Sequence, residues 1–179
     1  MEQIFSRFAM LVGEEGIEKL NKSSVIVFGI GGVGSYVVES LVRSGIGKIT
    51  MVDFDEISES NINRQIHALK STVGKSKIEV MKERILDINP ECEIELIKQL
   101  IYTYEDIEKI LTFTNEDKRM LFFSATMPDE IMKVAKNHMK EYEVLAVKSR
   151  ELTTDLTEQI YFEVNERDKF EALCRIIDL

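Results

Sequence analysis

Short apolar runs alternate with stretches of helical periodicity through the first hundred residues. Residues 25–28 are apolar without polar alternation, which is typical of a strand buried on both faces of a parallel sheet. Residues 48–52 form a second β-rich run, and residues 93–99 alternate polar and apolar positions like a strand toward a sheet edge. Residues 35–44 and 74–89 place apolar side chains at helical spacing. This alternation predicts an α/β domain built on a parallel sheet.

The second half of the chain continues the alternation less regularly. Apolar runs predict a fourth strand at 120–123 and a fifth at 143–147. Helices are predicted at 104–111 and 129–140, followed by a polar linker at 150–155, a strand at 159–164 and a helix at 166–177. Two short helices around Gly13 are predicted to precede the first strand.

A glycine-rich turn directly follows the first predicted strand. Gly29 and Gly31 permit a tight turn and close approach by a phosphate, next to Gly32, while Gly34 lets the helix pack near the strand. The helix start offers unpaired N–H groups and a partial positive charge to an anion. Asp53 ends the second strand 19 residues after Gly34, near the spacing at which an acid binds a ribose. These features predict a nucleotide site; the alternative is a turn that binds nothing.

Two cations lie just past the second strand. Arg64 stands in the segment SNINRQ and Lys77 in VGKSK. A triphosphate calls for such residues, because Arg and Lys neutralise the charge of a departing pyrophosphate. A nicotinamide or flavin dehydrogenase also fits the glycine motif, but it leaves Arg64 and Lys77 unexplained.

These motifs, GIGGVGS and SNINRQIHAL above all, resemble the ThiF/MoeB/HesA family, relatives of the ubiquitin-activating enzymes, over about residues 5–100. Within that family they look most like the tRNA threonylcarbamoyladenosine dehydratase branch. The resemblance implies a Rossmann-like, ATP- and Mg²⁺-dependent domain that activates a carboxylate by adenylylation, a homodimer, and tRNA as a partner. It also implies that Arg64 and Lys77 stabilise the triphosphate, which Asn61, Asn63 and Gln65 position.

Three further positions are interpreted through the same resemblance. Asp55 is a candidate ligand for ribose or metal. Arg7, in FSRFAMLVGEEG, resembles an arginine that reaches the partner subunit's nucleotide, the alternative being a surface arginine in a frayed helix. Arg7, Arg64 and Lys77 are therefore the candidate catalytic residues. No metal ligand is assigned, because the family's magnesium-binding aspartate follows the fourth strand, and no acid ends the run 120–123.

The segment KRMLFFSATMPDEIMKVAKNHM resembles the third motif region of a DEAD-box RNA helicase, with SAT at 124–126. This second resemblance covers about residues 106–179, and the helicase's phosphate loop and DEAD acids are missing. The sequence therefore predicts a chimera: a ThiF-type half at 1–105, helicase-derived elements at 106–149, and a linker with a strand–helix arm at 150–179.

Both parent folds place a strand beside the first one. Residues 120–123 are therefore expected to lie beside residues 25–28, in a doubly wound, mainly parallel sheet of order 3-2-1-4-5 with a C-terminal strand–helix extension. Ser124 and Thr126 would then lie at the opening of the nucleotide site. The alternative is that they are hydroxyl residues at the end of a strand without a functional role.

Composition and net charge limit the possible partners and the cellular location of the protein. The chain of 179 residues is long enough for a domain with a core, and its net charge of −9 argues against a general nucleic-acid coat. Cys92 and Cys174 form no CxxC pair, so neither a disulfide framework nor zinc is expected. No apolar run approaches membrane-span length and the start lacks a secretory pattern, which predicts a cytoplasmic protein without membrane contact.

Three functions stay open from the sequence. The first is an adenylating domain that is truncated and weakly active. The second is a nucleotide-binding chimera without catalysis, favoured by the missing magnesium aspartate. The third is an RNA-interacting fragment derived from the helicase.

Overall fold

The computed structural model describes residues 3–100, 104–112, 114–115, 117–123, 129–139, 141–146 and 163–177. The chain divides into two compact units, Met1–Lys140 and Glu141–Leu179.

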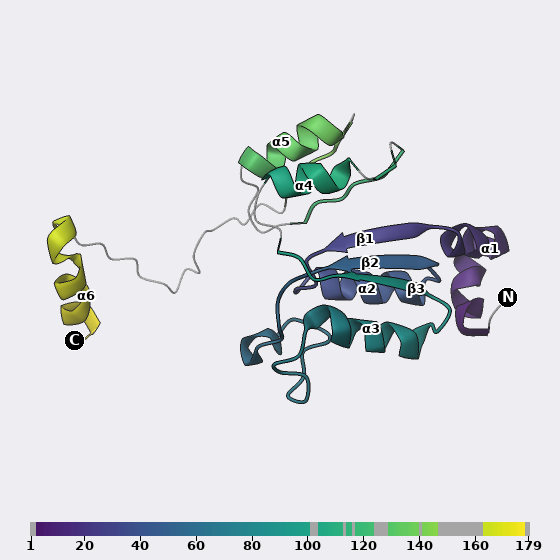
Figure 1. Cartoon of the computed structure of the whole chain (residues 1–179), viewed down its shortest axis with the longest axis horizontal. Helices are drawn as coiled ribbons and strands as arrows, with labels where there is room; N and C mark the ends of the chain where they lie inside the picture. Colours follow the sequence, from purple (N-terminus) through teal and green to yellow (C-terminus); the bar gives the residue numbers. More distant parts are fainter. Residues whose placement is uncertain are drawn as a thin grey trace. The chain divides into compact units, whose positions relative to one another are not determined.

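A three-stranded parallel sheet forms the centre of the first unit (Figure 1). Its strands are β1 (Ser24–Phe28), β2 (Lys48–Val52) and β3 (Glu93–Ile97), in the order β1-β2-β3. Val27 pairs with Met51, which pairs with Leu96 on the other side. The 3-2-1 part of the predicted order is therefore confirmed, with β2 in the middle.

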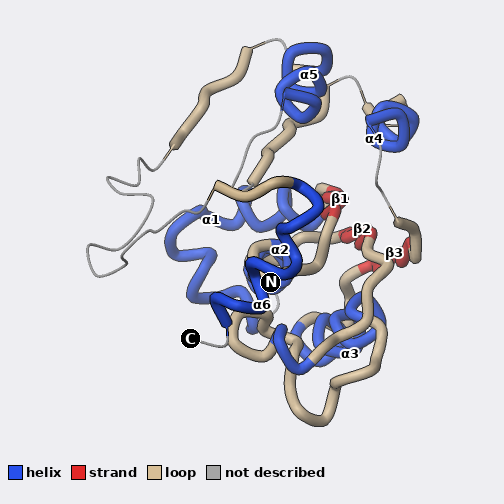
Figure 2. The backbone as a smooth tube through the Cα atoms, turned by 90° about the vertical axis from the view of Figure 1, so that its left-hand side faces the viewer, coloured by secondary structure: helices blue, strands red, loops and turns tan. Residues whose placement is uncertain are grey.

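Two helices pack on one face of this sheet, α2 (Gly34–Arg43) and α3 (Lys77–Ile88), as Figures 1 and 2 show. The layer between these helices and the sheet is apolar. Each fully buried aliphatic side chain in it contributes about 1.5–3 kcal/mol to the stability of the fold. Its fully buried members are Ile30, Val38, Val42, Ile49, Met51, Met81 and Ile85. The helical periodicity read from the sequence thus supplies the core.

Helix α1 (Ser6–Asn21) closes the amino-terminal end of the sheet, after the short 3-10 helix η1 (Gln3–Phe5). It is kinked at Gly13, where φ is 76°, as the prediction of two helices around this residue anticipated. The backbone N–H of Gly47, just before β2, donates to the carbonyl of Leu20 at 3.2 Å. Helix α1 therefore lies at the end of the strands opposite the glycine turn.

The predicted fourth and fifth strands are not formed by the described residues 117–123 and 141–146, which have no regular secondary structure. Leu121 and Phe123 are 80% and 65% exposed. A strand needs a hydrogen-bonded neighbour and a covered face, and an apolar run guarantees neither. The expectation that residues 120–123 lie as a strand beside β1 is therefore wrong for this structure, and Ser124 and Thr126 lie outside the described residues.

The helices of the second half do form. They are α4 (Tyr104–Leu111), α5 (Asp129–His138), η3 (Glu166–Asp168) and α6 (Lys169–Ile177). His138 of α5 and Glu108 of α4 meet at 2.6 Å. The predicted linker 150–155 and most of the strand 159–164 lie outside the described residues, and residues 163–164 have no regular structure. Among the described helices, none has the length and hydropathy that a membrane crossing requires.

Glu39 joins the two helices that cover the sheet. Its side chain is 10% exposed and bonds both Arg84 of α3 and Arg43 of α2. The Arg84 hydrogen bond, helped by Arg43, holds the pKa of Glu39 below its ordinary 4.5, although burial opposes this. The ion pair therefore stabilises the fold above the unfolded-state pKa, and its contribution is lost as pH falls through the folded-state pKa.

We expect Glu39→Gln to lower the free energy of unfolding at neutral pH by about 1–2 kcal/mol, a value discounted for the partial exposure of both arginines. Urea unfolding of the variant and the parent measures this difference. It should shrink as the pH falls from about 4.5 toward the lower pKa of the folded state, where the parent's carboxylate becomes protonated. Glu83→Gln, at an exposed position of the same α3 helix, is the control and should change little. A difference that stays constant with pH would contradict the ion-pair explanation.

Candidate nucleotide site

The turn between β1 and α2 depends on two glycines. Gly29 has φ of 80°, a conformation that side chains rarely adopt, and its N–H donates to the carbonyl of Val52 at 2.8 Å. A Cβ at Gly34 would lie 1.8 Å from the carbonyl oxygen of Gly29, so no side chain fits there. The chain can therefore turn sharply from the end of β1 into the start of α2.

The two middle glycines leave room over the turn. A Cβ placed on Gly31 would meet only Nε2 of Gln65, at 3.9 Å, within 4 Å. One placed on Gly32 would meet Cδ, Cγ and the carbonyl oxygen of Arg64 at 3.7 Å. These are ordinary contacts, so the turn remains approachable, with Arg64 and Gln65 beside it. The start of the ten-residue helix α2 adds its positive dipole end at this place.

Asp53 connects the glycine turn to the end of β2. It is 9% exposed, and its Oδ2 accepts a hydrogen bond from the N–H of Ile30 at 2.5 Å. Its Oδ1 accepts from the N–H of Asp55 at 2.8 Å. A carboxylate has about four acceptor positions, so two remain for a ligand's hydroxyl groups. The acid predicted from spacing thus lies at the turn.

Lys77, the first residue of α3, points into the same region. Its side chain is only 7% exposed, and its ammonium lies 2.6 Å from Oδ2 of Asp55, which is 61% exposed. The backbone reinforces the pair, since the N–H of Lys77 donates to the carbonyl of Asp55 at 3.1 Å. Because a buried ammonium needs a partner, the contact with Asp55 holds the Lys77 side chain in place.

The segment between Asp55 and Lys77 is a closed loop that carries the polar candidates. A bridge joins Glu56 to Ser76 at its base. Asn61 is buried, and its Oδ1 accepts from the N–H of Ser58 at 3.1 Å, capping the 3-10 helix η2 (Glu59–Asn61). Arg64 donates to the carbonyl of Ser60 at 2.6 Å and to Oδ1 of Asn63 at 2.9 Å. Asn61 and Asn63 therefore shape the loop that presents Arg64.

His67 and Ser35 are parts of this region that the sequence did not single out. His67 is 2% exposed, and neither ring nitrogen has a hydrogen-bond partner in the described part of the chain. Burial lowers the pKa of His67, as does the nearby Lys77, while Asp53 opposes the shift. Ser35 is fully buried, and its hydroxyl accepts from the N–H of Ile66 at 3.4 Å. The sequence feature that could have indicated His67 is the histidine within the motif SNINRQIHAL.

Arg7 is not brought to this site. It is exposed on α1, which lies at the opposite end of the strands. Its predicted action on a nucleotide would have to occur in a second copy of the chain.

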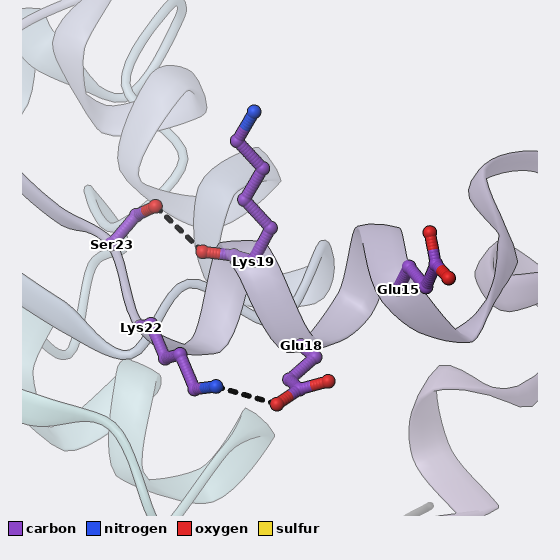
Figure 3. Close-up of a pocket in the computed structure, with 5 residues that line it drawn as sticks. All are labelled: Glu15, Glu18, Lys19, Lys22 and Ser23. Carbon is purple, nitrogen blue, oxygen red and sulfur yellow. Dashed lines mark hydrogen bonds and ion pairs between the residues drawn. The ribbon is translucent and has the colours of Figure 1, made fainter.

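An open hollow lies along α1 and the residues just after it (Figure 3). It is lined by Glu15, Glu18, Lys19, Lys22 and Ser23. Lys22 pairs with Glu18, and the Ser23 hydroxyl donates to the carbonyl of Lys19 at 2.7 Å. None of the predicted site residues lines this hollow. Exposed ion pairs such as Lys22–Glu18 contribute little to the stability of the fold.

Fold and site together define an α/β domain with an open glycine turn at the carboxyl ends of its parallel strands. The chain belongs to the ThiF family, whose model matches residues 5–117. The predicted family membership is confirmed.

The similar proteins include tRNA-modifying enzymes. The tRNA threonylcarbamoyladenosine dehydratase of Bacillus subtilis is 50% identical over 109 residues, covering 61% of this chain and 42% of the relative. The crystal structure of the Escherichia coli tRNA N6-threonylcarbamoyladenosine dehydratase in complex with ATP superposes with a TM-score of 0.60 at 41% identity, covering 64% of this chain and 46% of that one. The chain thus spans less than half the length of these two relatives.

A second similarity concerns helicases. A probable ATP-dependent RNA helicase of Methanocaldococcus jannaschii is 49% identical over 73 residues, which covers 41% of this chain and 19% of the helicase. The predicted partial resemblance to DEAD-box proteins is confirmed.

Proposed function

We propose that the chain binds ATP at the glycine turn and is a ThiF-type adenylating domain. In such a reaction a carboxylate oxygen attacks the α-phosphorus of ATP, an acyl-adenylate forms, and pyrophosphate leaves. The observation that carries the proposal is that Asp53 and Arg64 contact one open turn, while Lys77 is linked to Asp53 through Asp55. Asp53 would hold the ribose, the turn's N–H groups the phosphates, and the two cations the leaving pyrophosphate.

The remaining candidates have supporting roles in this proposal. Gln65 would contact the phosphates from its position beside Gly31. Asn61 and Asn63 would act through the loop geometry that presents Arg64. Asp55 would hold the buried Lys77 side chain in position before the nucleotide arrives.

Magnesium fits this site only with the nucleotide's help. In the described ranges no three His, Cys, Asp or Glu side chains gather as a metal site. Asp53 already accepts two backbone N–H groups, and Asp55 pairs with Lys77. Mg²⁺ is commonly held by one or two carboxylates and substrate phosphates, so it would enter as the ATP complex, with Asp55 as a candidate carboxylate if Lys77 turns from it to the phosphates.

The names of the similar enzymes suggest the acceptor, and the family resemblance of the sequence suggests the assembly. We propose that the activated carboxylate belongs to a threonylcarbamoyl-adenosine in tRNA, which would place the reaction in the cytoplasm. We further propose a homodimer in which the exposed Arg7 reaches the nucleotide of the second copy. Sedimentation as a monomer at micromolar concentration would remove the case for Arg7.

A nucleotide-binding chimera without turnover is the second candidate. Among the described residues, β2 is the only strand beside β1, so no described strand on the other side of β1 adds a second acid next to Asp53 at the glycine turn. In this proposal a ThiF-type half, 1–105, is joined to helicase-derived segments at 106–149 and 150–179. An RNA-interacting module is the third candidate.

Calorimetric titration with ATP and Mg²⁺, paired with an assay for released pyrophosphate in the presence of an acceptor tRNA, tests these functions. The adenylating domain requires both binding and release. If ATP binds but no pyrophosphate is released, the inactive chimera is selected. If ATP neither binds nor releases pyrophosphate, the helicase-derived module is selected. Binding of NADH in place of ATP would contradict the proposal and select a dehydrogenase.

A further inference from the structure

Four buried polar atoms in the loop between Asp55 and Lys77 have no hydrogen-bond partner in the described part of the chain. They are Oε1 of Gln65, Nδ1 and Nε2 of His67, and Oγ of Ser76. Gln65 and His67 are 6% and 2% exposed. Native proteins rarely leave such atoms unpaired, so a concentration of them marks a place where something else interacts.

Two of these three residues adjoin the proposed phosphate site. The Gln65 amide lies beside Gly31 of the turn, and Ser76 directly precedes Lys77. The backbone of His67 is fixed, because its carbonyl accepts the hydroxyl of Thr72 at 2.9 Å. The side chain of His67 is buried, in the loop that carries Arg64 and leads into Lys77.

Three charged groups act on this imidazole. Lys77 and Arg84, both from α3, disfavour its protonation, and Asp53 after β2 favours it. Burial is the largest cause and the two cations add to it, so the pKa of His67 lies below its ordinary 6.5 and the neutral ring predominates at pH 7. A triphosphate placed at Lys77 would offset that cation with negative charge and reverse the balance.

We propose that His67 is a positioning residue for the triphosphate: it takes up one proton from solvent when phosphates bind beside Lys77, and the imidazolium then faces the bound anion. This inference rests on the proposed ATP site. It adds a third cation, present only in the nucleotide complex, to the two cations that the sequence predicts. It also couples nucleotide affinity to pH.

The test compares the parent with His67→Gln, which keeps a donor and an acceptor but does not titrate. Dissociation constants for ATP and AMP are measured from about pH 8 to about pH 5.5, a range that spans the titration of histidine. The ratio of parent to variant affinity cancels the titration of the nucleotide itself. For ATP this ratio should rise about three- to tenfold toward low pH, because a pKa increase of one unit corresponds to tenfold. AMP, which lacks the outer phosphates, should show a smaller change.

Nuclear magnetic resonance gives a second measurement that needs no loss of His67. The chain has two histidines, so His138→Gln leaves one imidazole signal to titrate. Its pKa should lie below 6.5 in the free protein and rise when ATP is added. Lys77→Met in the same background should raise this pKa without nucleotide. Should His67→Gln fail to fold, this titration alone decides.

The outcomes separate this inference from the function on which it rests. Failure of the parent chain to bind ATP would overturn the proposed function and this inference with it. ATP binding with a flat affinity ratio and an unchanged His67 titration would overturn only this inference. An equal loss of ATP and AMP affinity at every pH would assign His67 a purely structural role.

Discussion

Gly32→Val is expected to reduce ATP affinity at least about a hundredfold while leaving the fold intact, a loss of about 2.7 kcal/mol or more in binding free energy. The valine side chain would occupy the space over the turn that a phosphate needs. The fold should tolerate it, because a Cβ at this position meets Arg64 at an ordinary 3.7 Å and the backbone φ is not positive. Calorimetric titration measures the affinity, and thermal unfolding checks the fold.

Two companion variants make this result interpretable. Gly32→Ala adds only a methyl group and should weaken ATP binding less than valine does. Gly34→Ala should instead destabilise the protein, since its Cβ would lie 1.8 Å from the Gly29 carbonyl oxygen. If Gly32→Val bound ATP as tightly as the parent, the phosphates would not lie over this turn.

Lys77→Met is expected to lower ATP affinity about ten- to a hundredfold, because a hydrogen bond between charged groups contributes about 1.5–3 kcal/mol. Affinity for AMP should change little, since the ammonium is assigned to the outer phosphates. The fold should survive, because methionine fills a similar volume and the released Asp55 is 61% exposed to water. Parallel titrations with ATP and AMP separate the two effects.

Lys75→Met is the matched control. Lys75 is exposed two residues earlier in the same loop, so its loss removes the same charge from the chain without emptying the site. An equal loss of ATP affinity in both variants would mean that Lys77 acts only through the overall field of the protein. Equal losses for ATP and AMP in Lys77→Met would contradict its assignment to the outer phosphates.

Local patterns predicted the nucleotide half well. Strand, glycine turn, helix and acid are close in sequence, and their contacts follow from covalent neighbours and periodicity. The contact of Asp53 with the turn, at 2.5 Å from the Ile30 N–H, is a direct consequence of two adjacent parallel strands. The kink at Gly13 and the bounds of β2 were predicted for the same reason.

Features that depend on distant partners were not predicted. The run at 120–123 is as apolar as β1, yet Leu121 is 80% exposed. An apolar composition alone does not provide the edge of a neighbouring strand with which this run could form hydrogen bonds. The Lys77–Asp55 ion pair depends on how the intervening loop closes, and the burial of His67 depends on the same closure. Spacing in the sequence indicated which residues matter but not which of them contact one another.

The most direct test of the central claim follows backbone amide resonances of the parent chain during titration with ATP, with AMP and NADH in parallel. We predict that the largest shifts fall on Gly31, Gly32 and Val33, with smaller ones at Asp53 and Lys77, and that AMP moves Lys77 least. Shifts concentrated on α1, beside the hollow at Lys19 and Lys22, or a response to NADH but not to ATP, would contradict the claim that this glycine turn is an ATP site.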